Sequence, residues 1–135
     1  LFVTSGGKNI APHPIELALT AKPYIDQVCL IGDARKYISA LVVPDFQELH
    51  RFSKHNGIPA CSDKDLLANE QVKELIQKQV DEVNEALPRY EQIKYYKLLD
   101  KPFSVETGEL TPTLKLKRRI VFEKFKDDIE SMYKD

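Results

Sequence analysis

Two apolar runs, at residues 27–33 and 37–45, most constrain the fold. They read QVCLIGD and YISALVVPD, are rich in β-branched residues, and are separated only by ARK. Continuous apolar runs of this length, bounded by turn residues, indicate well-buried strands. We therefore expect two antiparallel strands at the centre of a small sheet.

The segment from Asp63 to Leu87 carries the clearest helical pattern. Its apolar side chains recur at three- and four-residue spacing, with Lys, Glu, Gln and Asp between them. This pattern predicts one long amphipathic helix, which Pro88 ends because proline cannot continue it.

The other predicted elements are shorter. They are a hairpin at the N-terminus, a helix opened by Pro12 and Pro14, a helix capped by Asp45, a strand at 93–99, a loop at 100–110, and a final helix from about residue 116 to 133. We therefore predict an α+β fold. It combines the N-terminal hairpin with a central three-stranded sheet, mostly antiparallel, and packs them with about four helices.

Composition limits the class of protein. With 135 residues, 42% of them apolar, the chain suits a single domain spanning residues 1–135. A net charge of −1 argues against coating nucleic acid or an anionic membrane, so any anion binding must be local. Cys29 and Cys61 lack metal or redox spacing, and Cys29 suits a buried position in a strand. We expect a cytoplasmic setting.

The start of the chain is abrupt. It opens on Leu1 rather than Met, in an apolar LFV that has the character of a strand already under way. We interpret the sequence as a piece of a longer polypeptide, which would hold only part of any functional site.

A glycine turn, SGGK at residues 5–8, separates two short apolar runs and predicts a β-hairpin. Paired glycines supply positive φ without steric cost, so a plain turn explains them as well as a ligand site does. The turn matches neither a dinucleotide fingerprint nor a phosphate-binding Walker loop.

Four basic residues stand close together near the end of the chain: Lys115, Lys117, Arg118 and Arg119. We expect them at the start of a helix, where the helix dipole favours acidic residues instead. Lys115 would share a helical face with Arg118 or Arg119, while Lys117 would point elsewhere. The TGELTPT before them suggests a mobile arm that delivers one lysine, and a solvated charge run is the alternative.

Acid–base and metal motifs are missing from the sequence. His13, His50 and His55 lie in no recognisable metal or nucleophile arrangement, and the carboxylates are scattered. We expect no metal site, and electrostatic and positional chemistry rather than acid–base chemistry.

The glycine turn and the basic segment together resemble one family. LFVTSGGKNIAPHPIE, residues 1–16, looks like the glycine hairpin that opens the C-terminal domain of the adenylate-forming enzymes. GELTPTLKLKRRIV, residues 108–121, looks like their C-terminal lysine motif, and residues 28–45 are similar to the central hairpin of the long-chain fatty acyl-CoA synthetase branch. The resemblance covers essentially the whole chain, with the motifs in the family's order.

The resemblance implies roles for particular residues. Lys115 matches the catalytic lysine that reaches the substrate carboxylate and the α-phosphate during adenylation. Thr113 and Leu114 precede it where the commoner pattern has Ser-Gly, a form similar to the long-chain branch. Gly7 matches the hairpin glycine that approaches the nucleotide during thioester formation. The residues that flank it on the coenzyme A side are Ser5, Gly6, Lys8 and Asn9.

The implied function is that of the lid domain of a long-chain-fatty-acid–CoA ligase. Such an enzyme activates a fatty acid with ATP and Mg²⁺ to an acyl-adenylate, then transfers the acyl group to coenzyme A. An N-terminal adenylation domain, upstream of Leu1, would bind most of the ATP and the acyl chain. The isolated lid is then expected to be inactive, and the whole enzyme could associate peripherally with a membrane.

Two alternatives stay open at this point. One keeps the chemistry but changes the acceptor, giving an acyl-AMP ligase that loads a carrier protein. The other is a non-catalytic binding module whose basic loop grips RNA or an acidic partner. The sequence lacks the exposed aromatic pattern of an RNA reader, so no nucleic-acid partner is expected.

Overall fold

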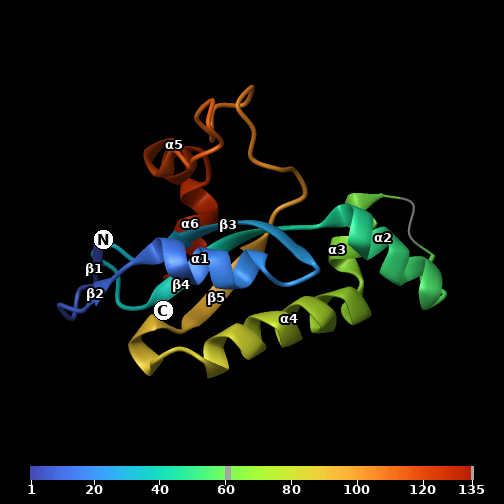
Figure 1. The fold of residues 1–135 in the computed structure, drawn as a ribbon, viewed down its shortest axis with the longest axis horizontal. Helices are drawn as coiled ribbons and strands as arrows, with labels where there is room; N and C mark the ends of the chain where they lie inside the picture. The colour runs from blue at the N-terminus through green and yellow to red at the C-terminus, as the bar shows by residue number, and fades with distance from the viewer. Residues whose placement is uncertain (60–61, 135) are drawn as a thin grey trace.

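A three-stranded sheet lies at the centre of the computed structural model, which describes residues 1–59 and 62–134 (Figure 1). Its strands are β3 (Ile25–Ile31), β4 (Ile38–Pro44) and β5 (Ile93–Leu98), in the order β3-β4-β5. β3 and β4 are antiparallel, as predicted, and β4 and β5 are parallel. Only β4 is central, because β5 pairs with β4 and leaves β3 at an edge.

A long crossover connects β4 to β5, as a parallel pair requires. It holds α2 (Phe46–His55), α3 (Asp63–Ala68), α4 (Glu70–Glu85) and a short 3₁₀ helix (Arg89–Glu91). Asp45 caps α2, as predicted, by accepting from the Glu48 N–H.

The prediction of one helix from Asp63 to Leu87 is wrong. The helix is interrupted at Asn69, whose backbone is extended and whose side chain accepts from the Val72 N–H at 3.1 Å. An asparagine side chain competes for local backbone groups in this way, so it ends α3 and caps α4.

Alternating residues of β3 and β4 fill two separate cores. Val28, Leu30, Ala40 and Val42 face the first core, with buried residues of α1, α2, α3 and α4. Cys29, Ile31, Leu41 and Val43 face the second, with residues of the loop after β5 and the last two helices. Both faces of these strands are therefore covered, which explains their continuous apolar sequence.

The end of the chain also differs from the prediction. Instead of one helix from about 116 to 133, there are α5 (Arg118–Lys124) and α6 (Lys126–Ser131), which meet at Phe125 with φ −110° and ψ 25°. The Phe125 ring packs edge-on against Phe103, with centroids 6.1 Å apart. The predicted apolar face survives the break, since Val121, Ile129 and Met132 are all buried.

The N-terminal segment packs beside β3 and β4. β1 (Phe2–Val3) and β2 (Asn9–Ile10) form the predicted hairpin, and α1 (Pro12–Thr20) follows. Gly32 allows this packing, because a Cβ built there would lie 2.2 Å from Ile38 Cδ1 and 3.2 Å from Phe2 Cδ2. The α+β class, with two antiparallel strand pairs and one parallel pair, is confirmed.

Cys29 is buried, as predicted, and burial raises the pKa of its thiol to about 12. Cys61 lies outside the described residues. Within the described segments, no helix combines the length and apolarity needed to cross a bilayer.

Candidate functional site

Lys115 lies in a small hairpin formed by residues 109–117, the Lys115 hairpin, and not at the start of a helix as predicted. Leu110 and Leu116 pair across it, and the Lys117 N–H donates to the Glu109 carbonyl at 2.7 Å. Thr111 closes the turn, because its N–H donates to the Lys115 carbonyl and its hydroxyl accepts from the Lys115 N–H. Leu114 has φ +63°, a left-handed backbone that completes the turn.

The Lys115 side chain is exposed and lines a cavity of about 580 Å³ between α1 and the Lys115 hairpin. The walls include apolar side chains from α1 and the loop: Leu17, Phe103, Leu110, Leu114 and Leu116. Among the described residues, no carboxylate lies within ion-pair distance of the Lys115 ammonium. The lysine is therefore available to an anion that enters the cavity.

The other three cations have different surroundings. Arg118 begins α5 and forms two hydrogen bonds, of 2.7 and 2.6 Å, with the buried carboxylate of Glu16 in α1. Arg119 lies 3.5 Å from Glu123 and is almost fully exposed. Lys117 is exposed and does not line the cavity. The structure thus separates four basic residues that the sequence presents as one cluster.

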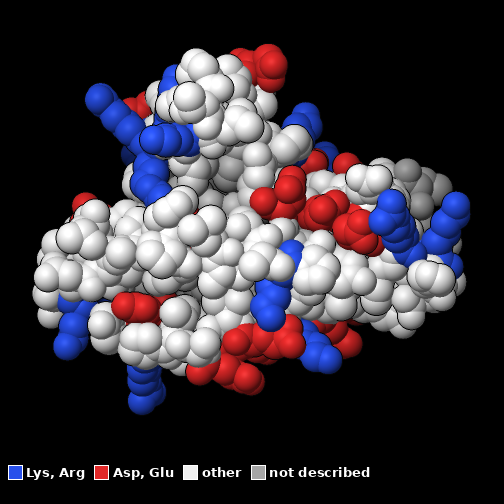
Figure 2. Space-filling model, viewed as in Figure 1, with Lys and Arg blue, Asp and Glu red and all other residues white. Residues whose placement is uncertain are grey.

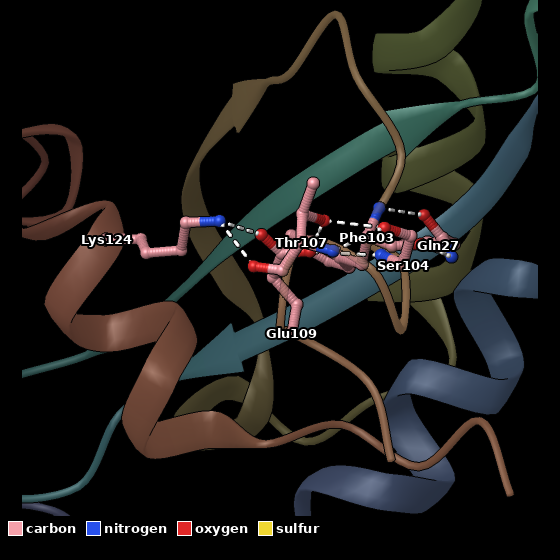
Figure 3. A network of polar contacts seen from close by, with 6 residues as sticks. All are labelled: Gln27, Phe103, Ser104, Thr107, Glu109 and Lys124. Atoms are coloured by element: carbon pink, nitrogen blue, oxygen red, sulfur yellow. Dashed lines mark hydrogen bonds and ion pairs between the residues drawn. The ribbon is translucent and has the colours of Figure 1, made fainter. Parts of the chain in front are cut away.

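A buried carboxylate, Glu109, fixes the base of the Lys115 hairpin (Figure 3). It accepts from the Ser104 N–H at 3.0 Å, from the Lys124 ammonium at 2.5 Å and from the Thr107 hydroxyl. Burial alone would raise the pKa of Glu109, but these donors outweigh it and lower the pKa to about 2.

The residues before Lys115 are therefore tied down and do not form the mobile arm suggested by their composition. Gln27 of β3 adds a second anchor, since its side chain donates to the Phe103 carbonyl and accepts from the Phe103 N–H. Sequence reasoning missed Glu109 because a single acidic residue in a turn-rich loop carries no periodic signal. Only its position within the lysine motif, two residues before Thr111, could have indicated from the sequence that Glu109 lies near the site.

The glycine hairpin comprises Ser5 to Lys8, which connect β1 to β2, together with Asn9 at the start of β2. All of these residues are exposed. Gly7 has φ +83°, and a Cβ built on it would meet nothing within 4 Å. The glycine therefore serves the backbone of the turn and leaves open space beside it.

The turn that joins β3 to β4 supports the glycine hairpin through backbone bonds. The Ser5 N–H donates to the Arg35 carbonyl at 2.9 Å, and the Ala34 N–H donates to the Val3 carbonyl at 2.8 Å. On its other side the Lys8 ammonium lies 5.3 Å from the centre of the Tyr90 ring.

The two hairpins occupy different parts of the molecule. In Figure 1 the blue glycine hairpin lies at the left and the orange loop leading to the Lys115 hairpin rises at the top. Basic side chains project over α5 on this face, and acidic ones gather towards α2 (Figure 2). The structure thus does not bring the predicted glycine and lysine sites together.

The histidines are dispersed. His13 lines the cavity beside Lys115, whereas Nε2 of His50, in α2, lies 2.9 Å from Asp63 Oδ1. Across residues 1–59 and 62–134, no three His, Cys, Asp or Glu residues are grouped to hold a metal ion.

Comparisons with known proteins agree with the expected family and fold. A family model described as AMP-binding enzyme C-terminal domain matches residues 1–135. A long-chain-fatty-acid–CoA ligase of Mycobacterium tuberculosis, FadD15, is 39% identical over 98% of this chain and 22% of its own length. The ligase ACSBG1 of Bos taurus is 36% identical over 100% of this chain and 21% of its own length.

A solved structure shows the same fold. The adenylation domain of a carboxylate reductase from Mycobacterium chelonae superposes with a TM-score of 0.77 at 28% identity, over 100% of this chain and 19% of that one. The chain spans about a fifth of the length of the curated relatives that it matches. These findings confirm the expected resemblance, and the chain belongs to the family of AMP-binding enzyme C-terminal domains.

Proposed function

We propose that this chain is the lid domain of a long-chain fatty acyl-CoA synthetase. Its full-length enzyme would activate a fatty acid with ATP to an acyl-adenylate and transfer the acyl group to coenzyme A. The observation that carries the proposal is a lysine at a cavity with no ion partner in residues 1–59 and 62–134, in a chain 39% identical to part of a long-chain-fatty-acid–CoA ligase.

The domain organisation is part of the proposal. Residues 1–135 would form one lid, and an adenylation domain upstream in the same polypeptide would bind the acyl chain and most of the ATP. We assign Mg²⁺ to that domain as well. The Lys115 cavity fits an anionic substrate, because it combines apolar side chains with an ammonium that has no ion partner among the described residues.

In adenylation, Lys115 would act by charge alone. The reaction brings a carboxylate up to a triphosphate, so two anions must approach each other. An ammonium in a partly desolvated site screens that approach and stabilises the charge that develops on the α-phosphorus. Lys115 meets these needs because its side chain borders the cavity and, in the part of the chain that the structure describes, pairs with no carboxylate, while Glu16 in the same cavity is bound to Arg118.

In thioester formation, the glycine hairpin would replace the Lys115 hairpin at the reacting centre. Gly7 presents no side chain, so the pantetheine thiol could pass close to its backbone. Ser5, Gly6, Lys8 and Asn9 would border the same path. The side chain of Asn9 is too short to suit direct contact with the adenylate phosphate, so we assign Asn9 only to the border of the thiol path. The separation of the two hairpins supports a lid that turns between two faces.

The two half-reactions of the full-length enzyme test this proposal. Lys115→Ala should lower acyl-adenylate formation by about 10²-fold or more, the scale for loss of one preorganised contact at a transition state. Conversion of supplied acyl-adenylate to the thioester should stay nearly unchanged. Pyrophosphate release and thioester yield measure the two steps.

Lys117→Ala is the matched control. It removes the same charge two residues away, from a side chain that does not line the cavity, and should change neither step appreciably. A crippling effect of Lys117→Ala with a mild effect of Lys115→Ala would show that the lysine is misassigned by two residues. Equal losses in both steps for Lys115→Ala would contradict the two-face lid.

A second acceptor is the specific alternative. The similarity to the adenylation domain of a carboxylate reductase, a protein not named as a CoA ligase, leaves room for a carrier-protein thiol in place of coenzyme A. The 39% identity to a long-chain-fatty-acid–CoA ligase favours coenzyme A. Thiol-acceptor assays on the full-length enzyme, which we expect to be cytoplasmic with peripheral attachment to membranes, distinguish the two.

A further inference from the structure

We propose that Glu16 and Arg118 are a positioning pair that holds Lys115 in place for adenylation. This inference rests on the proposed function of Lys115 and adds two residues to which no role in the reaction has been assigned. Neither residue is proposed to contact the reacting atoms. Their effect would be transmitted through the Lys115 hairpin.

Hydrogen bonds of the Glu16–Arg118 pair link Arg118 to both α1 and the central sheet. The Glu16 side chain, only 7% exposed, accepts both guanidinium N–H groups of Arg118 and also the Leu30 N–H at 2.8 Å. Leu30 is a fully buried residue of β3. Arg118 is thereby fixed to the central sheet through α1, and bidentate geometry restricts its orientation as well as its distance.

Little free chain separates Arg118 from Lys115. Of the two residues between them, Leu116 pairs with Leu110 and Lys117 donates its N–H to the Glu109 carbonyl. A shift of Arg118 would therefore move the strand of the hairpin that carries Lys115. All three side chains, those of Glu16, Lys115 and Arg118, line the same cavity.

Stability alone explains the pair poorly. Arg118 is the first residue of α5, where the helix dipole disfavours a cation. Burial by itself would lower the pKa of Arg118, and the bonds to Glu16 outweigh it and raise the pKa. Buried ion pairs generally contribute little net stability compared with apolar replacements, so a role in fixing geometry accounts better for this one.

The pair would also leave Lys115 as the cation of the cavity that binds an entering anion. Because Glu16 neutralises Arg118, the guanidinium does not compete with the Lys115 ammonium for an entering anion. Loss of the pair should therefore misplace Lys115 within an intact cavity. A displacement of about 1 Å at a reacting group can cost on the order of 10²-fold in rate.

The test uses the full-length enzyme with both partners replaced together, Glu16→Gln with Arg118→Met. This double variant leaves no unpaired buried charge, and the glutamine carbonyl can still accept from Leu30. We expect acyl-adenylate formation to fall by about 10-fold or more, with thioester formation from supplied acyl-adenylate unchanged. Arg119→Met, one residue along and 91% exposed, is the matched control and should leave both steps unchanged.

A second measurement asks whether the pair acts through Lys115. In a Lys115→Ala background, the same double replacement should cause no further loss of adenylation, since groups that act as a unit are not additive. A further loss of the same size would overturn the inference. So would an equal fall in both half-reactions together with a lower unfolding temperature, the signature of a merely structural pair.

The two proposals fail differently. If Lys115→Ala leaves adenylation intact, the proposed role of Lys115 fails, and the positioning role with it. If Lys115→Ala separates the two steps while the double replacement leaves adenylation unchanged, only the positioning role is overturned.

Discussion

The glycine hairpin and the Lys115 hairpin are built by different means. The first is held by backbone hydrogen bonds to residues 34 and 35 and by the neutral or exposed side chains of Thr4 and Asp33, which accept from the Lys8 and Val3 N–H groups. The second is held by two buried carboxylates, Glu109 and Glu16, each bound to a cation of α5. The exposed tip of the glycine hairpin, residues 5–8, should therefore tolerate loss of side chains but not their addition. The Lys115 hairpin should be sensitive to single charge removals.

The largest expected effect is a complete loss of activity in the isolated chain, because each hairpin would supply only part of a site. We expect the isolated chain of residues 1–135 to fold and yet to release no pyrophosphate from ATP in the presence of fatty acid and Mg²⁺. Far-ultraviolet circular dichroism checks the fold and a coupled pyrophosphate assay checks turnover. Clear turnover by this chain would contradict the lid assignment and remove the basis for comparing the hairpins.

The next effect concerns the glycine hairpin in the full-length enzyme. Gly7→Leu should lower thioester formation by about 10²-fold, because it places a branched side chain in the space that the thiol would cross. Adenylation should change little. Gly57→Leu is the matched control, since Gly57 also has positive φ, at +64°, with open space beside it, but follows α2. Similar losses in both variants would attribute the effect to backbone strain.

The third effect concerns the stability of the Lys115 hairpin. Glu109→Gln should lower the free energy of unfolding by about 2 kcal/mol at pH 7, because an amide cannot replace a carboxylate that accepts from a cation and other donors. Denaturant unfolding of the chain measures this change. Glu106→Gln, an exposed acid in the same loop, is the control and should change stability little.

The pH dependence sharpens the same comparison. The folded pKa of Glu109, about 2, lies below its ordinary value of 4.5, so its contribution is present above pH 4.5 and is lost as the pH falls towards 2. The difference in stability between the parent and Glu109→Gln should therefore shrink across this window. A difference that stays constant from pH 7 to pH 2 would show that Glu109 contributes through packing and not through its charge.

The fold shows which features the sequence could predict and which it could not. The β3 and β4 strands, the glycine turn and the α2 cap follow from local patterns that persist in the structure. The breaks at Asn69 and Phe125 do not, because the helices end there while the apolar spacing in the sequence continues across both residues. Sequence placed Lys115 on a helix because its basic neighbours continue into α5.

The partners of the basic residues depend on contacts between distant parts of the chain. Glu16 and Arg118 are 102 residues apart, so no local pattern could pair them. Family resemblance assigned Lys115 without its surroundings, and the structure added the cavity, Glu109 and Glu16. Acidic partners bind Arg118 and Arg119, and the cavity distinguishes Lys115, which lines it, from Lys117, which does not.

The most direct test of the account compares Lys115→Ala and Gly7→Leu in both half-reactions of the full-length enzyme. The account predicts a crossover: Lys115→Ala loses adenylation and keeps thioester formation, and Gly7→Leu loses thioester formation and keeps adenylation. If each variant instead lowers both steps by the same factor, the two hairpins do not serve separate steps, and the central claim is wrong.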